Sequence, residues 1–174
     1  MLSLLYNLTI MRDYISTAEA AKKMKVSRVA VFNMIKDGRL SAKRIGRNYA
    51  ISKKEFNQTY LQNLQRSVDA VLKSIDIVEY YLGRFKKAEF FSTVAIQDAF
   101  IWRIQVVGWS LKKIPLPIKR QHADWQEWIT AANRYLRFYW KINTHEIWKT
   151  ATKKIKPLKK QLLQIKKDLE KDQT

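Results

Sequence analysis

The sequence contains no cysteine, only two histidines, and few residues that interrupt helices. Without cysteine the chain forms no disulfide and offers no thiolate ligand, and His122 and His145 alone do not make a clustered histidine site. Glycine occurs four times and proline three times, so few positions break a helix. We therefore expect a mainly α fold that holds no metal and no other cofactor.

Acidic residues are also scarce, since 15 Asp and Glu stand against 34 Lys and Arg, for a formal net charge of +19 at pH 7. Such an excess implies a polyanionic partner, which is a nucleic acid, an acidic protein or an anionic membrane surface. Residues 1–60 hold 12 basic and 4 acidic side chains, and residues 61–174 hold 22 and 11. Both parts of the chain therefore contribute to the positive field.

No hydrophobic run is long enough to cross a membrane. The first ten residues are apolar, but they lack the basic start and the small-residue cleavage site of a secretory signal. We expect residues 1–12 to be an N-terminal extension, with Met11 as an alternative start. The expected protein is cytoplasmic and has no membrane partner.

Residues 13–56 carry two short helical patterns with clear start signals. A capping-box pattern at Ser16 predicts a helix over 18–24. After a tight turn, Ser27 is placed to cap a second helix over 28–36. The residues expected to pack the two helices together are apolar; they are Ala20, Ala21, Met24, Val26, Val31, Phe32 and Ile35.

A glycine ends the second helix, and a hairpin pattern follows it. Gly38 is the residue type favoured just beyond a helix C-terminus. Two short alternating runs, 40–45 and 48–51, flank Gly46 and predict a two-stranded β-hairpin. Helix, turn, helix and hairpin in this order are typical of a winged helix-turn-helix.

The second helix of a helix-turn-helix presents its N-terminal residues to base edges in the major groove. Those positions are Ser27, Arg28, Val29, Ala30 and Asn33. Arginine pairs with guanine or phosphate, asparagine pairs with adenine, and Val29 or Ala30 can touch a thymine methyl group. The hairpin adds Lys43, Arg44 and Arg47, which we expect to contact phosphate or the minor groove.

The pattern resembles the excisionase-type, MerR-like winged helix-turn-helix family over about residues 13–56. The residues that carry the resemblance are Tyr14-Ile-Ser-Thr-Ala-Glu-Ala-Ala, Val26-Ser-Arg, Val31-Phe-Asn-Met-Ile-Lys-Asp-Gly38-Arg-Leu and Arg44-Ile-Gly-Arg47. It implies sequence-specific binding to double-stranded DNA, usually as a dimer or along repeated sites. The alternative is a solvated helical pair, but a plain helical hairpin needs no Gly-Arg wing.

The rest of the chain, 57–170, is expected to be an α-helical bundle without a flexible linker before it. No glycine or proline falls between Gly46 and Gly83, and apolar residues recur there at spacings of three and four. This predicts one unbroken helix, or two abutting ones, over about 53–82, roughly 45 Å long at 1.5 Å per residue. Further apolar stripes are Ala88, Phe91, Ala95, Ala99, Trp102, Val106 and Trp109; Trp125, Trp128, Ala132, Tyr135 and Tyr139; and Ile155, Leu158, Leu162, Ile165 and Leu169.

The helical part resembles the HepT-like branch of the HEPN superfamily over about residues 66–168. The residues that carry the resemblance are Glu89-Phe90, Gln97-Asp98-Ala99-Phe100, Arg103 to Gly108, Leu111 to Pro115, Asp124-Trp125, Ala132 to Tyr139 and Ile147-Trp148. The resemblance implies an α-helical bundle that pairs as a homodimer. Many members are toxin ribonucleases that a partner nucleotidyltransferase neutralises.

The family's active motif reads Arg-Asn, three residues, His, one residue, Tyr. On this resemblance Asn133 and Tyr139 keep the family's residues, while Ala132 stands at the arginine and Arg137 at the histidine. RNA cleavage without a metal needs a group that exchanges a proton near neutral pH, and arginine stays protonated. His145 lies eight residues beyond Arg137, too far to replace the histidine by simple register. We expect the family's catalysis to be absent.

Two features of the helical part have competing interpretations. The six tryptophans are interpreted as core and dimer interface in preference to RNA-stacking platforms. The Lys-rich stretch 149–167 is interpreted as a solvated face in preference to a binding site. Arg134 and Arg137 can still hold a phosphate, so nucleic-acid binding without cleavage stays open.

The main hypothesis is a DNA-binding regulator of a toxin–antitoxin or mobile-element locus, dimerised through the helical bundle. Its expected partners are double-stranded DNA, a second copy of the chain and a nucleotidyltransferase-type antitoxin. A first alternative is a HepT-like ribonuclease toxin with a rearranged site. A second alternative is a recombination directionality factor that bends DNA beside an integrase site.

Overall fold

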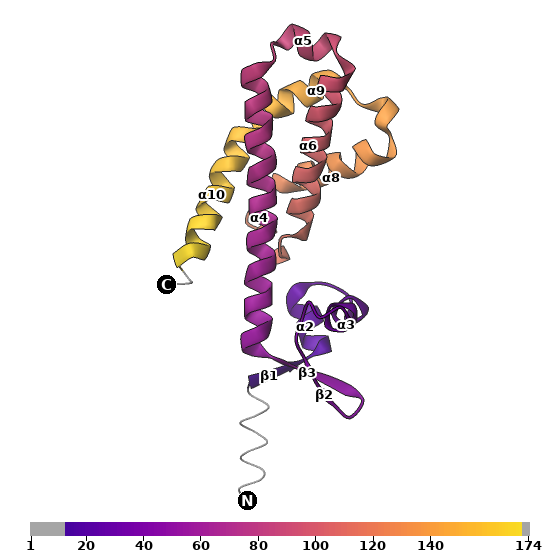
Figure 1. The fold of residues 1–174 in the computed structure, drawn as a ribbon, viewed down its shortest axis with the longest axis vertical. Helices are drawn as coiled ribbons and strands as arrows, with labels where there is room; N and C mark the ends of the chain where they lie inside the picture. The colour runs from indigo at the N-terminus through magenta and orange to yellow at the C-terminus, as the bar shows by residue number, and fades with distance from the viewer. Residues whose placement is uncertain (1–12, 172–174) are drawn as a thin grey trace, which may run out of the picture. The chain divides into compact units, whose positions relative to one another are not determined.

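The structure is a computed structural model that describes residues 13–171 (Figure 1). The expected N-terminal extension over 1–12 lies outside the described residues. The fold is mainly α, as the sequence predicts. The chain divides into two compact units, of which the first ends at Asn63 and the second begins at Leu64.

The first unit combines two short helices with a small sheet. Its elements are β1 (Tyr14–Ser16), α2 (Thr17–Met24), α3 (Arg28–Lys36), β2 (Lys43–Ile45), β3 (Asn48–Ser52) and the start of α4 (Lys53–Arg84). The predicted helices and hairpin are confirmed, but the sheet has three antiparallel strands in the order β1-β3-β2. The hairpin alone was expected because β1 is too short to show alternation. Ile15 of β1 is buried opposite Ile51 of β3.

The predicted helix caps are present. Ser16 Oγ accepts a hydrogen bond from the Glu19 N–H at 3.1 Å, and the Glu19 carboxylate accepts one from the Ser16 N–H at 2.8 Å. This second bond is the main reason why the pKa of Glu19 lies below its usual value. Ser27 Oγ accepts from the Ala30 N–H at 3.1 Å. Gly38 follows α3 with a φ of 70°, a conformation that glycine adopts without strain.

The core of the first unit differs from the expected set at two positions. Val26 and Phe32 were expected to pack between the helices, but they are 41% and 46% exposed. Phe32 follows the fully buried Val31, and one residue turns an α-helix by about 100°, so it faces away from the core. The buried apolar residues are Ile15, Ala20, Ala21, Val31, Met34, Leu40, Ile51 and Phe56.

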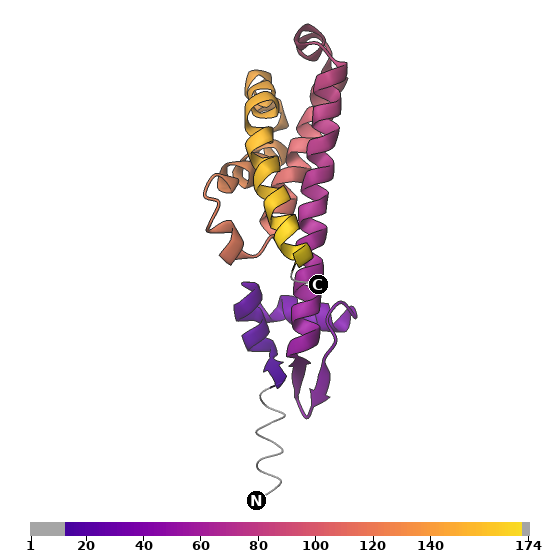
Figure 2. The same ribbon diagram turned by 90° about the vertical axis from the view of Figure 1, so that its left-hand side faces the viewer.

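The second unit is helical throughout its described length. It contains the later part of α4, then α5 (Lys87–Ser92), α6 (Val94–Lys113), α7 (Leu116–Lys119), α8 (Trp125–Arg137), the 3-10 turn η1 (Tyr139–Lys141), α9 (Thr144–Lys149), the π-helical turn η2 (Thr150–Lys154) and α10 (Ile155–Lys171). The 32 residues of α4 confirm the prediction of an unbroken helix. Figures 1 and 2 show α10 beside α4. Ion pairs join these two helices, from Lys159 to Asp76 and Glu79 and from Lys166 to Asp69.

The closest packing of the second unit is between α6 and α8. A Cβ atom added to Gly108 of α6 would lie 2.4 Å from the Trp128 carbonyl oxygen and 2.5 Å from the Ala132 Cβ of α8. Because real Cβ atoms do not approach other atoms this closely, only glycine allows the two helices to touch here. This contact fixes Ala132 in the core, where it is fully buried.

The predicted apolar stripes have mixed outcomes. The α10 stripe is confirmed, and the α8 stripe is confirmed except at Tyr139, which lies beyond the helix and is 50% exposed. The α5–α6 stripe is wrong, because Ala88, Ala95 and Trp102 are exposed. The residues of α5 and α6 that are buried instead are Phe90, Phe100, Ile101, Ile104, Val107 and Leu111. Apolar side chains surround α6, so spacing alone does not reveal its inner face.

The α6–α8 contact predicts opposite effects for two glycine substitutions. Gly108→Ala should destabilise the second unit by about 1–3 kcal/mol or more, because neither helix backbone can yield easily. Gly83→Ala is the control, since a Cβ there meets nothing within 4 Å and α4 gains up to about 1 kcal/mol of helix propensity. Urea unfolding followed by tryptophan fluorescence measures both, because all six tryptophans lie in this unit. An unchanged midpoint for Gly108→Ala would contradict the packing described.

Candidate functional site

The first candidate site is the exposed face of α3. Arg28, Val29 and Asn33 are exposed there, and Val29 reaches 67%. Ala30 is half-buried, and the Ser27 hydroxyl already accepts the Ala30 N–H as the helix cap. Three of the five predicted base-reading residues therefore present free side-chain faces, while Ser27 contributes mainly by starting the helix.

Phe32 belongs to this face, although sequence reasoning placed it in the core. It lies one turn after Val29, and its ring meets the Tyr49 ring of β3 edge-on, with 5.9 Å between centroids. The contact ties α3 to the hairpin within the first unit. A helical projection could have found it, because positions three apart share a helix face.

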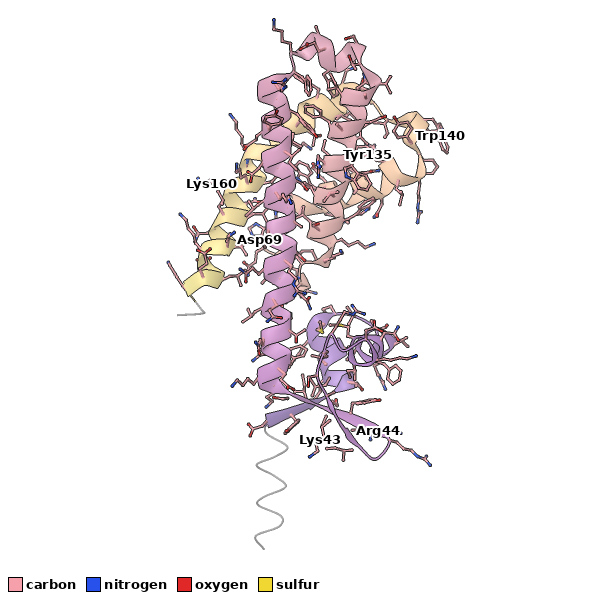
Figure 3. All side chains as sticks on the ribbon, in the orientation of Figure 1. Lys43, Arg44, Asp69, Tyr135, Trp140 and Lys160 are labelled. Atoms are coloured by element: carbon pink, nitrogen blue, oxygen red, sulfur yellow. The ribbon has the colours of Figure 1, made fainter. Side chains whose placement is uncertain are left out.

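The hairpin carries the predicted cations at its tip. Lys43 and Arg44 lie on β2, as Figure 3 shows, and Arg47 follows Gly46 at the turn. All three side chains are exposed, and Arg44 Nε donates to the Gly46 carbonyl oxygen at 3.2 Å. Gly46 has a φ of 57°, which favours glycine at this turn.

The cations of these two elements are not neutralised within the described part of the unit. Within residues 13–63, Arg39 forms an ion pair with Asp37, with 2.8 Å between the guanidinium nitrogen and the carboxylate oxygen. Arg28 and the three hairpin cations form none with any described residue. They are therefore available for an anionic ligand such as phosphate.

The second candidate site is the end of α8, where the resemblance places the altered motif. Ala132 is fully buried against Gly108, whereas Asn133 and Arg137 are exposed. The Tyr139 hydroxyl donates a hydrogen bond to the Asp98 carboxylate of α6, and this bond raises the pKa of Tyr139. Asn133 and Arg137 thus lie one turn apart on the exposed surface of α8, Tyr139 lies just beyond the helix in η1, and position 132 is inside the core.

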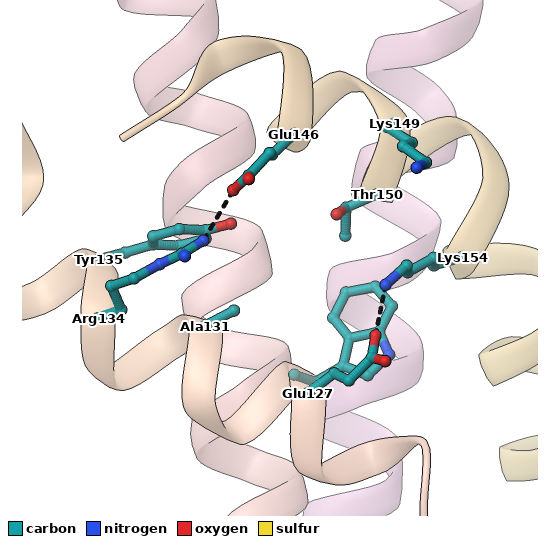
Figure 4. A pocket seen from close by; sticks show the side chains of 9 residues that line it. Glu127, Ala131, Arg134, Tyr135, Glu146, Lys149, Thr150 and Lys154 are labelled. Carbon is teal, nitrogen blue, oxygen red and sulfur yellow. Dashed lines mark hydrogen bonds and ion pairs between the residues drawn. The ribbon is translucent and has the colours of Figure 1, made fainter. Parts of the chain in front are cut away.

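A pocket of about 380 Å³ lies on another face of α8 (Figure 4). Its lining residues are Glu127, Trp128, Ala131, Arg134, Tyr135, Glu146, Lys149, Thr150 and Lys154. Arg134 pairs with Glu146 at 2.8 Å, and Lys154 pairs with Glu127. Because each carboxylate already has a cation, the pocket offers no evident base for proton transfer.

His145 is an exposed residue of α9. Its ring lies against the Phe91 ring, with 4.5 Å between centroids. The residues that the structure describes contain no cluster of three or more histidine or carboxylate side chains that could hold a metal ion. Within 13–171, no helix is both long and apolar enough to cross a membrane.

Two family models match the chain. The one described as a helix-turn-helix domain matches residues 14–63, and the one described as ribonuclease HepT-like matches residues 71–165. The second match covers more than half of the sequence. The chain belongs to the ribonuclease HepT-like family. Its HepT-like domain is fused to an N-terminal helix-turn-helix domain, as the two resemblances predict.

Relatives of the HepT-like domain carry ribonuclease names. A Methanocaldococcus jannaschii protein named for a gamma-glutamylcyclotransferase and a candidate RNase is 29% identical over 59% of this chain and 47% of its own length. A second candidate RNase of the same organism is 27% identical over 58% of this chain and 84% of its own. A candidate ribonuclease HepT of Thermococcus cleftensis is 22% identical over 58% of this chain and 93% of its own length.

The chain spans about half the length of the first of these relatives. No solved structure is similar to the chain at a significant level.

The buried position of Ala132 predicts that the family's arginine does not fit this core. Ala132→Arg should destabilise the HepT-like domain by about 1–3 kcal/mol or more, because the side chain overpacks the Gly108 contact and buries a charge. Asn133→Arg, on the exposed neighbouring position, should stay within about 0.5 kcal/mol of the parent. Tryptophan-monitored urea unfolding compares them. Equal stability of the two variants would show that position 132 tolerates arginine.

Proposed function

We propose that the protein is a sequence-specific double-stranded DNA-binding regulator, dimerised by a HepT-like domain that has lost its catalytic motif. The observation that carries this proposal is the exposed face of α3 together with the unpaired cations of the hairpin. Exposed Arg28 and Asn33 have the side chains that read guanine and adenine in the major groove. Phosphate contacts by Lys43, Arg44 and Arg47 would fix the register of the helix on the duplex.

Exposed apolar side chains of the HepT-like domain support pairing with a second copy. Large apolar residues stand exposed on α6 and at the end of α8; they include Val94 at 64%, Trp102 at 51%, Leu136 at 64% and Trp140 at 75%. Figure 3 shows Trp140 pointing away from the helices. With Trp140 in η1, these side chains come from three elements of the HepT-like domain, and contact with a second copy would cover them.

The unbroken α4 supports a dimer with defined half-site spacing, because one helix carries residues of both units. The setting we propose is a toxin–antitoxin or mobile-element locus, with a nucleotidyltransferase-type antitoxin as partner. This setting rests on the two family resemblances rather than on any single residue. The protein would then act in the cytoplasm.

The proposal predicts strongly salt-dependent DNA binding. If each protomer makes about 4 phosphate contacts, the logarithm of the dimer's affinity falls with the logarithm of salt at a slope of roughly −7. The variant R28Q/K43Q/R44Q/R47Q should lose most of this slope and most of the affinity for a selected operator. A control with the same charge change, K86Q/K87Q/K112Q/K113Q, replaces four exposed lysines of the HepT-like domain.

Fluorescence anisotropy with a labelled operator at several salt concentrations measures these slopes. The control should keep the parental ratio between operator and scrambled duplex. A flat salt response of the parent, or equal loss in both variants, would count against DNA reading by the first unit.

A HepT-like ribonuclease with a rearranged site is the second candidate, favoured by the ribonuclease names of the relatives. It would need Arg137 or His145 to exchange a proton. Arginine stays protonated at neutral pH, and His145 lies on α9, eight residues beyond Arg137.

We therefore expect the purified protein to degrade tRNA and mRNA no faster than the R137A/H145A variant does. Gel analysis of both proteins, prepared in parallel, checks this. Degradation by the parent that disappears in the variant would establish the ribonuclease.

A further inference from the structure

Five lysines form one exposed stripe on the C-terminal helical segment of the HepT-like domain. We call Lys149, Lys153, Lys156, Lys160 and Lys167 the lysine stripe; all are exposed. Apart from the last interval, they follow one another at three or four residues, through α9, η2 and α10. Positions at these spacings share one helix face. The opposite face of α10 is in the core, with Ile155, Leu158 and Leu162 buried.

The lysine stripe differs from its neighbours in having no acidic partner. Lys159 and Lys166, on the flank that faces α4, pair with Asp76, Glu79 and Asp69. Figure 3 shows Asp69 between the two helices and Lys160 on the far side of α10. Among residues 13–171, no lysine of the stripe forms an ion pair. The three acids of α4 that face α10 are thus used inside the fold, while Asp168 and Glu170 stand exposed at the end of α10.

Such an arrangement costs the helix stability. Like charges three or four residues apart destabilise a helix by about 0.2–0.5 kcal/mol per pair. The five lysines have no role in the core, because the apolar contacts of α10 lie on its other face. An external polyanion would remove this repulsion.

The chemistry of the stripe favours a nucleic-acid backbone over other polyanions. A helix that lies on a membrane surface needs an exposed apolar face. On the described part of α10, Leu163, which is 42% exposed, is a single exposed large apolar residue and does not make such a face. Protein interfaces are depleted in lysine and enriched in aromatic residues, and α10 contains no aromatic residue. Backbone phosphates are held by lysine without any apolar anchor.

The length of the stripe also favours an extended ligand. Lys149 and Lys167 are 18 residues apart in the sequence, or roughly 27 Å at 1.5 Å per residue. A groove of about 420 Å³ lies against it and is lined in part by Lys156, Lys160 and Lys167. A small anion would engage one or two of these lysines, whereas a phosphodiester chain can engage all of them.

We propose that the lysine stripe binds the phosphodiester backbone of a nucleic acid without reading its sequence. This site is separate from the α3 face and does not depend on the proposed regulator function. Duplex DNA and single-stranded RNA share the backbone chemistry, and the experiment distinguishes them.

The test uses the full chain in the R28Q/K43Q/R44Q/R47Q background, so that the first unit contributes little. Two further variants carry the same charge change: K153Q/K156Q/K160Q/K167Q in the stripe, and K86Q/K87Q/K112Q/K113Q as control. The control lysines are also exposed, and none is in an ion pair with a described residue. Circular dichroism checks that both variants keep the helical content.

Binding is measured for a non-operator duplex, a single-stranded RNA and anionic vesicles, between about 50 and 200 mM salt. We expect the stripe variant to bind the duplex, the RNA or both at least tenfold more weakly at the lower salt, with a salt slope shallower by up to about 3. The control should change less than threefold. The substrate that loses affinity identifies the ligand.

Three results would overturn the proposal. They are equal losses in the stripe and control variants, unchanged binding in the stripe variant, and stripe-dependent binding to vesicles but to neither nucleic acid. None of them bears on operator recognition by the first unit, which is measured in the parental background.

Discussion

The HepT-like domain depends on one close contact between two helices. Gly108 lets α6 approach the backbone of α8 at Trp128, and the same approach seals Ala132 inside the core. The altered motif is therefore not a set of surface substitutions around an intact pocket. Its first position has become a packing residue, while Asn133 and Arg137 stay at the surface. The packing of α6 on α8 and the small residue at position 132 thus follow from the same geometry.

Charge is the second constraint, because some charged side chains form ion pairs inside the fold and others stay unpaired at the surface. Five of the ten acids described in the HepT-like domain form ion pairs that join helical segments, such as Lys159 with Glu79 and Arg134 with Glu146. Unpaired cations stand on α3, at the hairpin and along the lysine stripe, and others such as Lys86 and Lys112 lie elsewhere on the HepT-like domain. Part of the net charge of +19 is thus gathered on three surfaces. That concentration supports polyanion binding more directly than the total charge does.

Much of the first unit was predictable, because its signals are local. The caps at Ser16 and Ser27 and the stop at Gly38 depend on residues within a few positions of each other. The strand β1 was missed, because its three residues acquire meaning only by pairing with β3. Phe32 was misplaced although a helical projection puts it on the face of Val29, one turn earlier, and away from the buried Val31.

For the HepT-like domain, the sequence predicted the helices but not, for every helix, which face is buried. Its helices followed from the scarcity of glycine and proline, and the α8 and α10 stripes identified their inner faces. The α6 stripe failed because Trp102 and Ala95 are as apolar as the buried Ile104. Burial of Ala132 was also beyond the sequence, because it depends on a glycine 24 positions earlier on another helix.

The central claim, that this chain reads DNA as a dimer, is tested most directly by selecting binding sites for the full protein from a pool of random duplexes. The account predicts enrichment of a motif with two half-sites at one fixed spacing. A selected pool that shows no enriched sequence would contradict it, and so would a single half-site without spacing preference.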